Sequence, residues 1–475
     1  MAVPVISIEQ MREWETAAWA AGKTEQEVIK RVGQAVAATA LSLTGAKDRV
    51  LILAGKGHNG DDARAAREHL AGRQVELLEA SDPVAAAAGL EAALNPPPDL
   101  VIDGLFGIGL NRSLSDEWIH FIERVNSGGC TVLAVDVPSG LDADTGQHFG
   151  AAIQAAVTLT VGAPKRGLLR ESAWPFVGRL EVAAEVGLGD CPLRSEIQWT
   201  LPADFRGFPP RRAVGTHKGS YGHLAIVAGS RGFHGAAVLA AQAAQRAQPG
   251  LITLHAPESV YPVIAPQFQA VMVTPWALDT KLPGPWSAVL VGPGLAAPEL
   301  PDQIKLLTRL LWRDSALPVV IDASALDWLP LDVTPRDAVR VLTPHPGEAA
   351  RLLRTTTERV QADRVAAVRE ISRRYANAWV VLKGHQTLVG RSSGEIYVNG
   401  SGNPHLAQGG SGDVLSGYIA GLLAQPGLRQ DVCRVLRFAV WQHGAAADRL
   451  QRQRANWTVE DLLRELGNVP ADSGG

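Results

Sequence analysis

The sequence predicts two α/β domains in series, each built around a largely parallel sheet. A chain of 475 residues is about three times as long as one ordinary domain. Short apolar runs alternate with helix-length segments in both halves, which is typical of strands joined by crossover helices. This alternation fails at residues 191–212, a proline-rich stretch that we interpret as a linker. The predicted domains are therefore residues 1–205 and residues 212–475.

The elements of each half follow from its apolar pattern. In the first half, helices are expected over residues 8–43 and 63–71, and strands at residues 50–54, 75–78, 100–102, 131–135 and 157–161. In the second half, strands are expected at residues 224–228, 251–254, 288–291, 318–321, 339–342 and 379–382, and helices at residues 414–423, 434–451 and 459–466.

Composition and charge exclude several classes of protein. The chain has 45 Lys and Arg against 48 Asp and Glu, whereas nucleic-acid-binding proteins usually have a basic excess. Its apolar stretches are far shorter than the roughly 18 residues of a membrane span. Three widely spaced cysteines support neither a disulfide framework nor a zinc site, and the start of the chain, rich in Glu, is unlike a signal peptide. We therefore expect a cytoplasmic protein that binds neither nucleic acid nor membrane.

A glycine-rich loop at residues 55–62 follows the first expected strand of the sheet. It satisfies the pattern G-x-G-x-x-G between a strand and a helix, and Glu79 lies nineteen positions after Gly60. In dinucleotide-binding folds such a loop lets the backbone approach a pyrophosphate at a helix N-terminus. A phosphate-bearing ligand is one interpretation of the loop, and an ordinary glycine-rich turn is the other.

Oxygen-bearing side chains follow three strands of the predicted first sheet. They are Asn59 and Asp62 after the first strand, Asp103 after residues 100–102, and Asp136 and Ser139 after residues 131–135. The carboxyl ends of parallel strands meet at one edge of a sheet, so these groups should converge. Such oxygen ligands suit an alkali or alkaline-earth cation or a polar ligand. For each Asp, the alternative is an Asx turn or a helix cap.

Together, the motifs at residues 55–62, 103–112 and 136–140 resemble the epimerase domain of the NAD(P)H-hydrate repair enzymes, over residues 8–190. The resemblance implies a Rossmann-like domain that interconverts the R and S hydrates of NADH and NADPH, with Asp136 as the proton-transfer residue. It implies a potassium ion held by Asn59, Asp103 and Ser139. It also implies hydrate contacts at His58, Asn59, Gly60, Asp61, Asp62, Gly107, Ile108, Gly109, Leu110, Asn111, Arg112, Ser113 and Asp136.

Three positions depart from the pattern of that family. His58 stands where the family usually has Asn, Asp61 where it has Gly, and Ile108 where it often has Thr. A carboxylate at position 61 that faced the substrate phosphates would repel them. The sequence therefore leaves open a weakened or non-catalytic epimerase domain.

The most specific motif of the second half is Gly409-Gly410-Ser411-Gly412-Asp413, ahead of the helix expected at residues 414–423. Glycines before a helix expose backbone N–H groups, and the helix dipole adds positive potential, so residues 409–412 form a candidate anion cradle. Asp413, expected at the first helical position, is the candidate catalytic base for an attacking hydroxyl. The alternative is a glycine-rich helix cap with a charge-favoured Asp.

Further motifs follow other expected strands, at residues 292–295, 322–326, 343–348 and 383–387. With the glycine motif they resemble the dehydratase domain of the same repair enzymes, which is ribokinase-like, over residues 216–462. The resemblance implies that ADP, with magnesium, drives conversion of the S hydrate to NAD(P)H and yields AMP and phosphate. It implies hydrate contacts at Ala237, Gly294, His345 and Asp413, and nucleotide contacts at Lys383, Gly384, His385, Gln386, Thr387 and Gly412.

The leading hypothesis is thus a bifunctional repair enzyme whose substrates are NADHX, NADPHX and ADP, and the family resemblance also suggests a homo-oligomer. One alternative is a ribokinase-like small-molecule kinase, since such kinases use the same glycine-rich motif and base. Another is a dehydratase fused to a non-catalytic module. An NAD-dependent dehydrogenase built on the Gly55 loop and Glu79 explains neither the Asp136 motif nor the second half of the chain.

Overall fold

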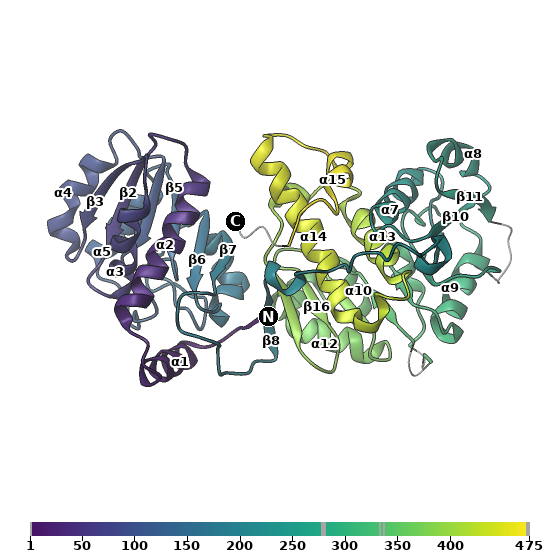
Figure 1. Ribbon diagram of the computed structural model, residues 1–475, viewed down its shortest axis with the longest axis horizontal. Coiled ribbons are helices and arrows are strands. Elements are labelled where there is room, and N and C mark those ends of the chain that lie inside the picture. The colour runs from purple at the N-terminus through teal and green to yellow at the C-terminus, as the bar shows by residue number, and fades with distance from the viewer. Residues whose placement is uncertain (1, 277–281, 332–333, 336–337, 472–475) are drawn as a thin grey trace. The chain divides into compact units, whose positions relative to one another are not determined.

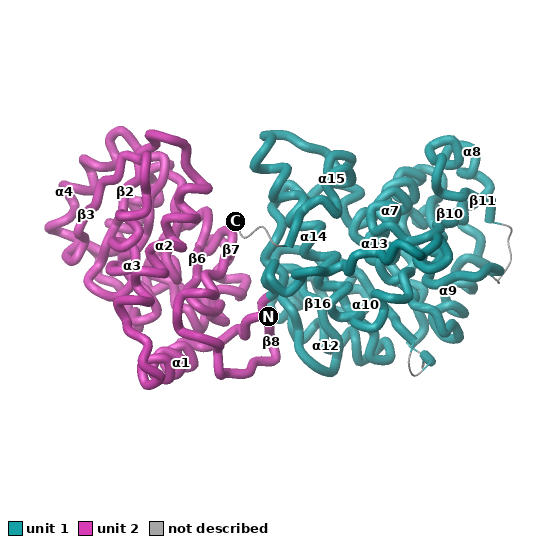
Figure 2. The backbone as a smooth tube through the Cα atoms, viewed as in Figure 1, with its two compact units in different colours: residues 1, 200–474 teal, residues 2–199, 475 magenta. Residues whose placement is uncertain are grey.

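The chain folds into two compact units, as a computed structural model of residues 2–276, 282–331, 334–335 and 338–471 describes it. Residues 2–199 form the first unit and residues from 200 onward form the second (Figures 1 and 2). The prediction of two α/β folds is confirmed. Within the described ranges, no helix is long and apolar enough to cross a membrane.

The predicted linker at residues 191–212 is wrong in part. Strand β8 (Ile197–Thr200) and a 3-10 turn (Pro202–Phe205) lie inside it. The Phe205 ring is fully buried, and the Asp204 carboxylate pairs with Arg437 of the second unit. The proline count suggested irregular chain, but Asp204 and Phe205 pack within the second unit through contacts with residues more than two hundred positions away.

The first unit is built on a parallel sheet with the strand order β3-β2-β4-β5-β6-β7. Its strands are β2 (Arg49–Ala54), β3 (Gln74–Glu79), β4 (Leu100–Gly104), β5 (Thr131–Val135), β6 (Val157–Val161) and β7 (Arg179–Ala183), while β1 (Val3–Pro4) pairs antiparallel with β8. Its helices are α1 (Ile8–Ala20), α2 (Glu25–Leu43), α3 (His58–Ala66), α4 (Pro83–Ala93), α5 (Asp116–Asn126) and α6 (Trp174–Val177).

Helices cover both faces of this sheet. Alternate residues of β2 belong to different cores: Ile52 packs in the cluster that contains Trp14 of α1, and Leu51 packs in the one that contains Phe121 of α5. This division follows from the pleat, because successive side chains of a strand point to opposite faces. The continuous apolar runs that predicted these strands are therefore explained by burial on both sides.

Two predicted helices of the first unit have different bounds. The helix expected over residues 8–43 is broken into α1 and α2 at Gly22, which has a φ of +84°, and Thr24 caps α2 by accepting a hydrogen bond from Glu27 N. The helix expected over residues 63–71 begins five residues earlier, at His58. The candidate binding residues His58–Asp62 therefore form the first turn of α3.

The second unit is a larger α/β fold, with its strands in the order β17-β16-β15-β14-β13-β12-β9-β10-β11. They are β9 (His223–Val227), β10 (Leu251–Pro257), β11 (Met272–Trp276), β12 (Ala288–Val291), β13 (Val319–Ile321), β14 (Arg340–Leu342), β15 (Trp379–Leu382), β16 (Leu388–Gly390) and β17 (Ile396–Asn399). The helices are α7 (His234–Arg246), α8 (Tyr261–Ile264), α9 (Asp302–Asp314), α10 (Pro346–Leu353), α11 (Thr357–Ala362), α12 (Arg364–Arg374), α13 (Ser411–Leu423), α14 (Val432–Gln453) and α15 (Val459–Glu465).

The sheet of the second unit is not wholly parallel. The sequence analysis did not identify β16 and β17, which join β15 as an antiparallel meander. Both are short, and their apolar runs are broken by Gly390, Ser393 and Gly394. The meander matters for the site because it ends the series of parallel strands whose carboxyl ends carry the motifs.

The helix behind the glycine motif lies unusually close to α7. A Cβ atom at Gly417 would lie 2.1 Å from the Ala240 carbonyl oxygen, and one at Gly421 would lie 2.7 Å from the Ala247 Cβ. These two glycines let the backbones of α13 and α7 approach, and both helices contribute fully buried residues to one core. The close packing against α7 therefore fixes the position of α13, which begins at the glycine motif.

Candidate active sites

The glycine-rich loop of the first unit needs its glycines for close backbone packing. A Cβ atom at Gly55 would lie 2.0 Å from the Leu105 carbonyl oxygen, and one at Gly60 would lie 2.1 Å from the Gly55 carbonyl oxygen. Strand β2 lies between β3 and β4, so the loop sits where the strand order reverses. This switch point is the usual place for a ligand crevice in open α/β sheets.

Three predicted oxygen ligands come together beside this loop. Ser139 Oγ donates to Asp103 Oδ1 at 2.6 Å, and Ser139 N donates to Asp103 Oδ2 at 2.9 Å. Asn59 Nδ2 donates to the Phe106 carbonyl at 2.9 Å, and the Phe106 N–H donates to Ser139 Oγ at 2.8 Å. Asp103 is fully buried, and burial raises the pKa of its carboxyl to about 6, against the opposing effect of its hydrogen bonds.

This oxygen cluster (Asn59, Asp103 and Ser139) fits a hard cation. It offers a carboxylate, an amide oxygen, a hydroxyl and a nearby main-chain carbonyl, but no imidazole or thiolate. Such a donor set suits an alkali or alkaline-earth ion. A positive charge there would also offset the cost of burying the Asp103 carboxylate.

Asp136 lies buried at the end of β5, with a φ of 63°. Its Oδ1 accepts hydrogen bonds from Thr160 Oγ1 at 3.1 Å and from Val161 N at 2.9 Å, and it forms an ion pair with Lys165. The sequence analysis missed Thr160 and Lys165. Lys165 comes four residues after β6, at the same carboxyl edge of the sheet, and that position was the signal that could have revealed it.

The side chains at the two departures in the α3 turn both have partners within the first unit. His58 Nε2 lies 2.7 Å from Glu25 Oε1. Arg64 lies 2.8 Å from Asp61 and 2.6 Å from Glu79, so it pairs with both carboxylates and offsets part of their negative charge. Glu79 therefore holds Arg64, in place of the ribose contact that a dinucleotide fingerprint would predict.

The remaining predicted hydrate contacts of the first unit lie in the α3 turn and in the loop between β4 and α5. Burial raises the pKa of Asp62 to about 8, and the charge of Asp136 adds to this shift. Gly107 lies beside Asn59, since a Cβ there would be 3.2 Å from Asn59 Cβ. Ile108 packs against the α1/α2 core, whereas Asn111, Arg112 and Ser113 are exposed. Gly109 and Leu110 lie in the same loop, between β4 and α5.

The second candidate site is built around the start of α13. Gly410 has a φ of +95° and caps the helix, which begins at Ser411. Asp413 is thus the third residue of the helix, whereas the sequence predicted it at the first helical position. A Cβ atom at Gly412 would lie 3.3 Å from Lys383 Nζ, so the Lys383 ammonium lies directly beside the anion cradle.

Carboxylates surround this ammonium group. Lys383 Nζ donates to Asp322 Oδ1 at 2.8 Å and lies 3.9 Å from Glu348 Oε2, while Thr343 Oγ1 donates to the same Asp322 oxygen at 2.7 Å. Asp322 and Glu348 lie in motifs that follow β13 and β14, but their roles could not be predicted from the sequence. Burial, then the charge of Asp322, raises the pKa of Asp413 to about 7, although Lys383 opposes the shift.

The other predicted hydrate contacts of the second unit differ in their burial and in their backbone geometry. His345 caps α10, since its Nδ1 accepts from Gly347 N at 3.1 Å, and burial lowers its pKa. Gly294 has a φ of +67°, and a Cβ there would lie 2.3 Å from the Phe233 carbonyl oxygen. Ala237 is fully buried in the core.

The predicted nucleotide loop, residues 383–387, is tightly bent. Gly384 has a φ of +123° and Gln386 one of +52°, and Thr387 Oγ1 donates to the Gly384 carbonyl at 2.9 Å. Burial lowers the pKa of His385, with a further contribution from the charge of Arg364. The buried Gln386 Nε2 has no hydrogen-bond acceptor among the described residues, so it is a donor that a ligand could satisfy.

His443, which was not predicted from the sequence, contacts the anion cradle at residues 409–412. His443 of α14 donates from Nε2 to the Ser411 carbonyl at 3.1 Å. Burial lowers its pKa to about 4, so the ring is neutral at physiological pH. Its position in the middle of a buried helix gave no sequence signal, because it follows from how α14 packs against α13.

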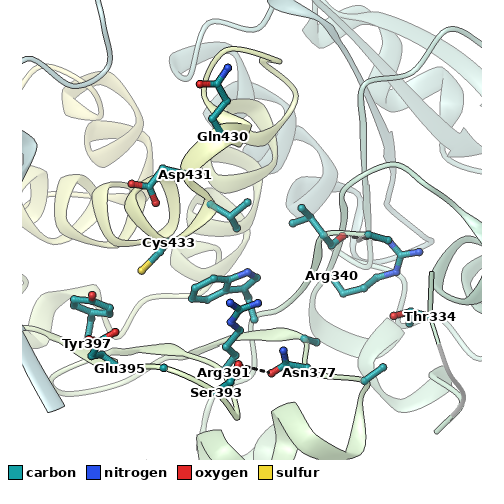
Figure 3. A pocket seen from close by; sticks show the side chains of 17 residues that line it. Thr334, Arg340, Asn377, Arg391, Ser393, Glu395, Tyr397, Gln430, Asp431 and Cys433 are labelled. Carbon is teal, nitrogen blue, oxygen red and sulfur yellow. Dashed lines mark hydrogen bonds between the residues drawn. The ribbon is translucent and has the colours of Figure 1, made fainter. Parts of the chain in front are cut away.

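A cavity of about 610 Å³ lies elsewhere in the second unit (Figure 3). Its wall includes Arg340 and Trp379, the first residues of β14 and β15, and also Arg391 and Cys433. This cavity is therefore at the amino ends of the strands. The motif residues are at the carboxyl ends, and none of them lines it.

Comparisons with known proteins cover both units. The family model described as "NAD(P)H-hydrate dehydratase" matches residues 224–467, and the one described as "YjeF-related protein N-terminus" matches residues 76–167. A crystal structure of an ADP/ATP-dependent NAD(P)H-hydrate dehydratase from Bacillus subtilis, co-crystallised with ATP and Mg²⁺, is 30% identical. It covers 56% of this chain and 95% of its own, with a TM-score of 0.51.

Curated relatives extend the likeness to nearly the whole chain. A bifunctional NAD(P)H-hydrate repair enzyme of Coxiella burnetii is 36% identical over 465 residues, which cover 93% of each chain. Another such enzyme, from Gloeobacter violaceus, is 36% identical over 509 residues, which cover 99% of this chain and 98% of the relative. The chain therefore belongs to the family of bifunctional NAD(P)H-hydrate repair enzymes.

Proposed function

We propose that this protein restores hydrated nicotinamide cofactors by two reactions, one in each unit. The first unit interconverts the R and S hydrates of NADH and NADPH, and the second dehydrates the S form at the expense of ADP. The observation that carries the proposal is the grouping of Asp413, the α13 N-terminus and the Lys383–Asp322 pair at one sheet edge. A base, an anion cradle and a fixed cation are what phosphoryl transfer to a hydroxyl requires.

In the dehydratase step, Asp413 takes the proton of the hydrate hydroxyl as the phosphoryl group is transferred to that oxygen. The backbone N–H groups at the start of α13 stabilise the charge on the phosphoryl oxygens. The transfer releases AMP. Phosphate is a better leaving group than hydroxide, so it departs with the electrons of the C–O bond, and loss of a proton from the neighbouring ring carbon restores the ring double bond. Magnesium, when bound with the nucleotide, would neutralise phosphate charge, in keeping with the ATP and Mg²⁺ of the Bacillus subtilis crystal.

In the epimerase step, Asp136 exchanges a proton with the substrate hydroxyl. The oxygen cluster of Asn59, Asp103 and Ser139 would hold a potassium ion next to the hydrate. His58–Asp62 and Gly107–Ser113 stay predicted contacts of that substrate, as do Ala237, Gly294 and His345 in the dehydratase unit and residues 383–387 and Gly412 for the nucleotide. A cytoplasmic location and an assembly of several copies also stay predictions.

A mixture of R and S NADH-hydrate tests both reactions at once. With protein, ADP and magnesium, dihydronicotinamide absorbance should return completely and faster than spontaneous epimerisation allows. A return that stops when the S form is consumed would mean that the first unit does not epimerise. If neither ADP nor ATP brings any return, the proposed function of the second unit is wrong.

The raised pKa of Asp413 predicts the pH dependence of dehydration. Because the pKa lies near 7, well above that of an ordinary Asp, the carboxyl is protonated at lower pH and cannot accept the hydroxyl proton. We expect kcat/KM with the S hydrate to fall about tenfold per pH unit below pH 7 and to level off above it. Initial rates between pH 5 and 9 measure this, and a flat profile down to pH 5 would contradict it.

Arg64 should protect substrate binding in the epimerase unit. Replacing it in an Arg64→Gln variant leaves the Asp61 and Glu79 carboxylates uncompensated near the substrate phosphates. We expect KM for the hydrate to rise about fivefold, equivalent to about 1 kcal/mol of repulsion between partly solvated charges.

The matched control is the double variant Arg64→Gln/Asp61→Gly, which should recover most of the lost affinity. Asp61→Gly alone should change KM little, because Arg64 already pairs with the Asp61 carboxylate. A double variant no better than Arg64→Gln would mean that the hydrogen bond from Arg64 to the Gly55 carbonyl is what binding needs.

A further inference from the structure

The two oxygens of the Asp136 carboxylate differ in their hydrogen bonds. Thr160 Oγ1, Val161 N and Lys165 Nζ all donate to Oδ1. Among the residues that the structure describes, no hydrogen bond ends on Oδ2. The side chain nevertheless keeps 12% of its surface exposed. One oxygen of this carboxylate is therefore saturated by the protein, and the other is left open.

Lys165 has no donor to offer a substrate. Its side chain is fully buried, and its ammonium donates to Asp136 Oδ1, to Thr160 Oγ1 at 3.2 Å and to the Val161 carbonyl at 2.9 Å. An ammonium has three protons, and these three bonds use all of them. Any effect of Lys165 on the reaction must therefore pass through Asp136.

The backbone also fixes the direction of Asp136. Its φ of 63° lies in the left-handed region, which is uncommon for a residue with a side chain, although Asp tolerates it better than most. The Asp136 N–H remains bonded to the Leu159 carbonyl at 2.8 Å, so the strained residue is anchored to β6. Strain that is held in place by surrounding bonds is common at functional sites.

The other charged groups around Asp136 are mostly negative. Asp62 and Glu15 both interact with it, and their own pKa values are raised, first by burial. Asp61 adds to the rise in the pKa of Asp62, whereas Lys165, His58 and Arg12 oppose the rise in that of Glu15. Lys165 is thus a buried cation among carboxylates, and it pairs directly with Asp136.

We infer that Lys165 is a positioning residue that keeps Asp136 ionised and makes Oδ2 the oxygen that exchanges a proton with the substrate hydroxyl. This inference rests on the proposed epimerase function. As the proton leaves the hydroxyl oxygen for Oδ2, that oxygen becomes a carbonyl and the bond between its carbon and the ring nitrogen breaks, with the electron pair going to the nitrogen. The nitrogen then adds to the other face of the carbonyl carbon, and Oδ2 returns the proton to the oxygen. Asp136 ends each cycle ionised, as it began, so no further reactant is needed.

The test compares the pH dependence of epimerisation in the full-length protein and three variants. Lys165→Met removes the charge but keeps the length and apolar stem of the side chain. We expect its rate at neutral pH to fall by about tenfold or more, and the pH of half-maximal rate to rise by at least about one unit. KM should change much less than kcat. Thr160→Val removes a neutral donor to the same oxygen and should raise that pH by less than Lys165→Met does, because a charge at contact distance outweighs a neutral hydrogen bond.

Lys165→Arg retains the charge and should keep the wild-type pH of half-maximal rate even if its kcat is lower. If Lys165→Met does not fold, a changed pH of half-maximal rate in Lys165→Arg would overturn the inference. An equal loss at every pH in a folded Lys165→Met variant would overturn it too, because that is what a purely structural lysine produces. A wild-type protein without epimerisation would instead refute the proposed function.

Discussion

An Asp413→Asn variant should lose ADP-dependent dehydration by about a hundredfold to ten-thousandfold, the usual contribution of a positioned general base. Asn has nearly the same shape but cannot accept the hydroxyl proton, so kcat should fall while KM for the hydrate changes little. Initial rates of dihydronicotinamide return from pure S hydrate measure this. Epimerisation by the same variant should be unaffected, because Asp136 belongs to the other unit.

The matched control for this variant is Asp314→Asn. Asp314 is exposed at the end of α9 and pairs only with solvent-facing Arg313 at 2.8 Å among the contacts described. The same chemical change there should leave dehydration within about twofold, since surface pairs contribute little. If Asp413→Asn kept a tenth or more of the wild-type kcat, Asp413 would not be the base.

An Asp136→Asn variant should lose epimerisation by a similar factor and keep dehydration of the S hydrate. It should also destabilise the first unit, because the fully buried Lys165 ammonium would lose its carboxylate partner. Breaking a buried ion pair from one side costs about 3–5 kcal/mol. Conversion between the resolved R and S hydrates measures the first effect, and denaturant unfolding measures the second.

The control for Asp136 is Asp116→Asn, an exposed carboxylate in the first turn of α5. It should leave both epimerisation and unfolding nearly unchanged. If Asp136→Asn epimerised at the wild-type rate, the first unit would act on the hydrate through another group. If Asp136→Asn neither epimerised nor bound the hydrate, the loss would reflect unfolding and not proton transfer.

Much of the fold could be predicted from the apolar pattern. Strands such as β5, β12 and β15 have the predicted bounds, because strands covered by helices on both faces are continuous apolar runs. The pattern failed where a fold feature depends on distant contacts or on single backbone angles. Gly22 splits a helix that looked continuous, and Phe205 is buried although its surroundings look like a linker.

The candidate sites likewise contain some residues that the local sequence predicted and others that it did not. Motif residues such as Asp103, Ser139 and Asp413 were predicted because glycine-rich turns at strand ends have a distinctive local sequence. His443 was missed because its place beside Ser411 follows only from how α14 packs against α13. Lys165, the partner of Asp136, carries no motif, and its position just after β6 was its one signal in the sequence.

The stoichiometry of products tests the central claim most directly. Pure S NADH-hydrate would be incubated with the protein, magnesium and limiting ADP, and NADH, AMP and inorganic phosphate would be counted together. The proposed repair reaction predicts one of each for every ADP consumed. A stable phosphorylated product, with AMP but without free phosphate or NADH, would contradict it and identify the second unit as a small-molecule kinase.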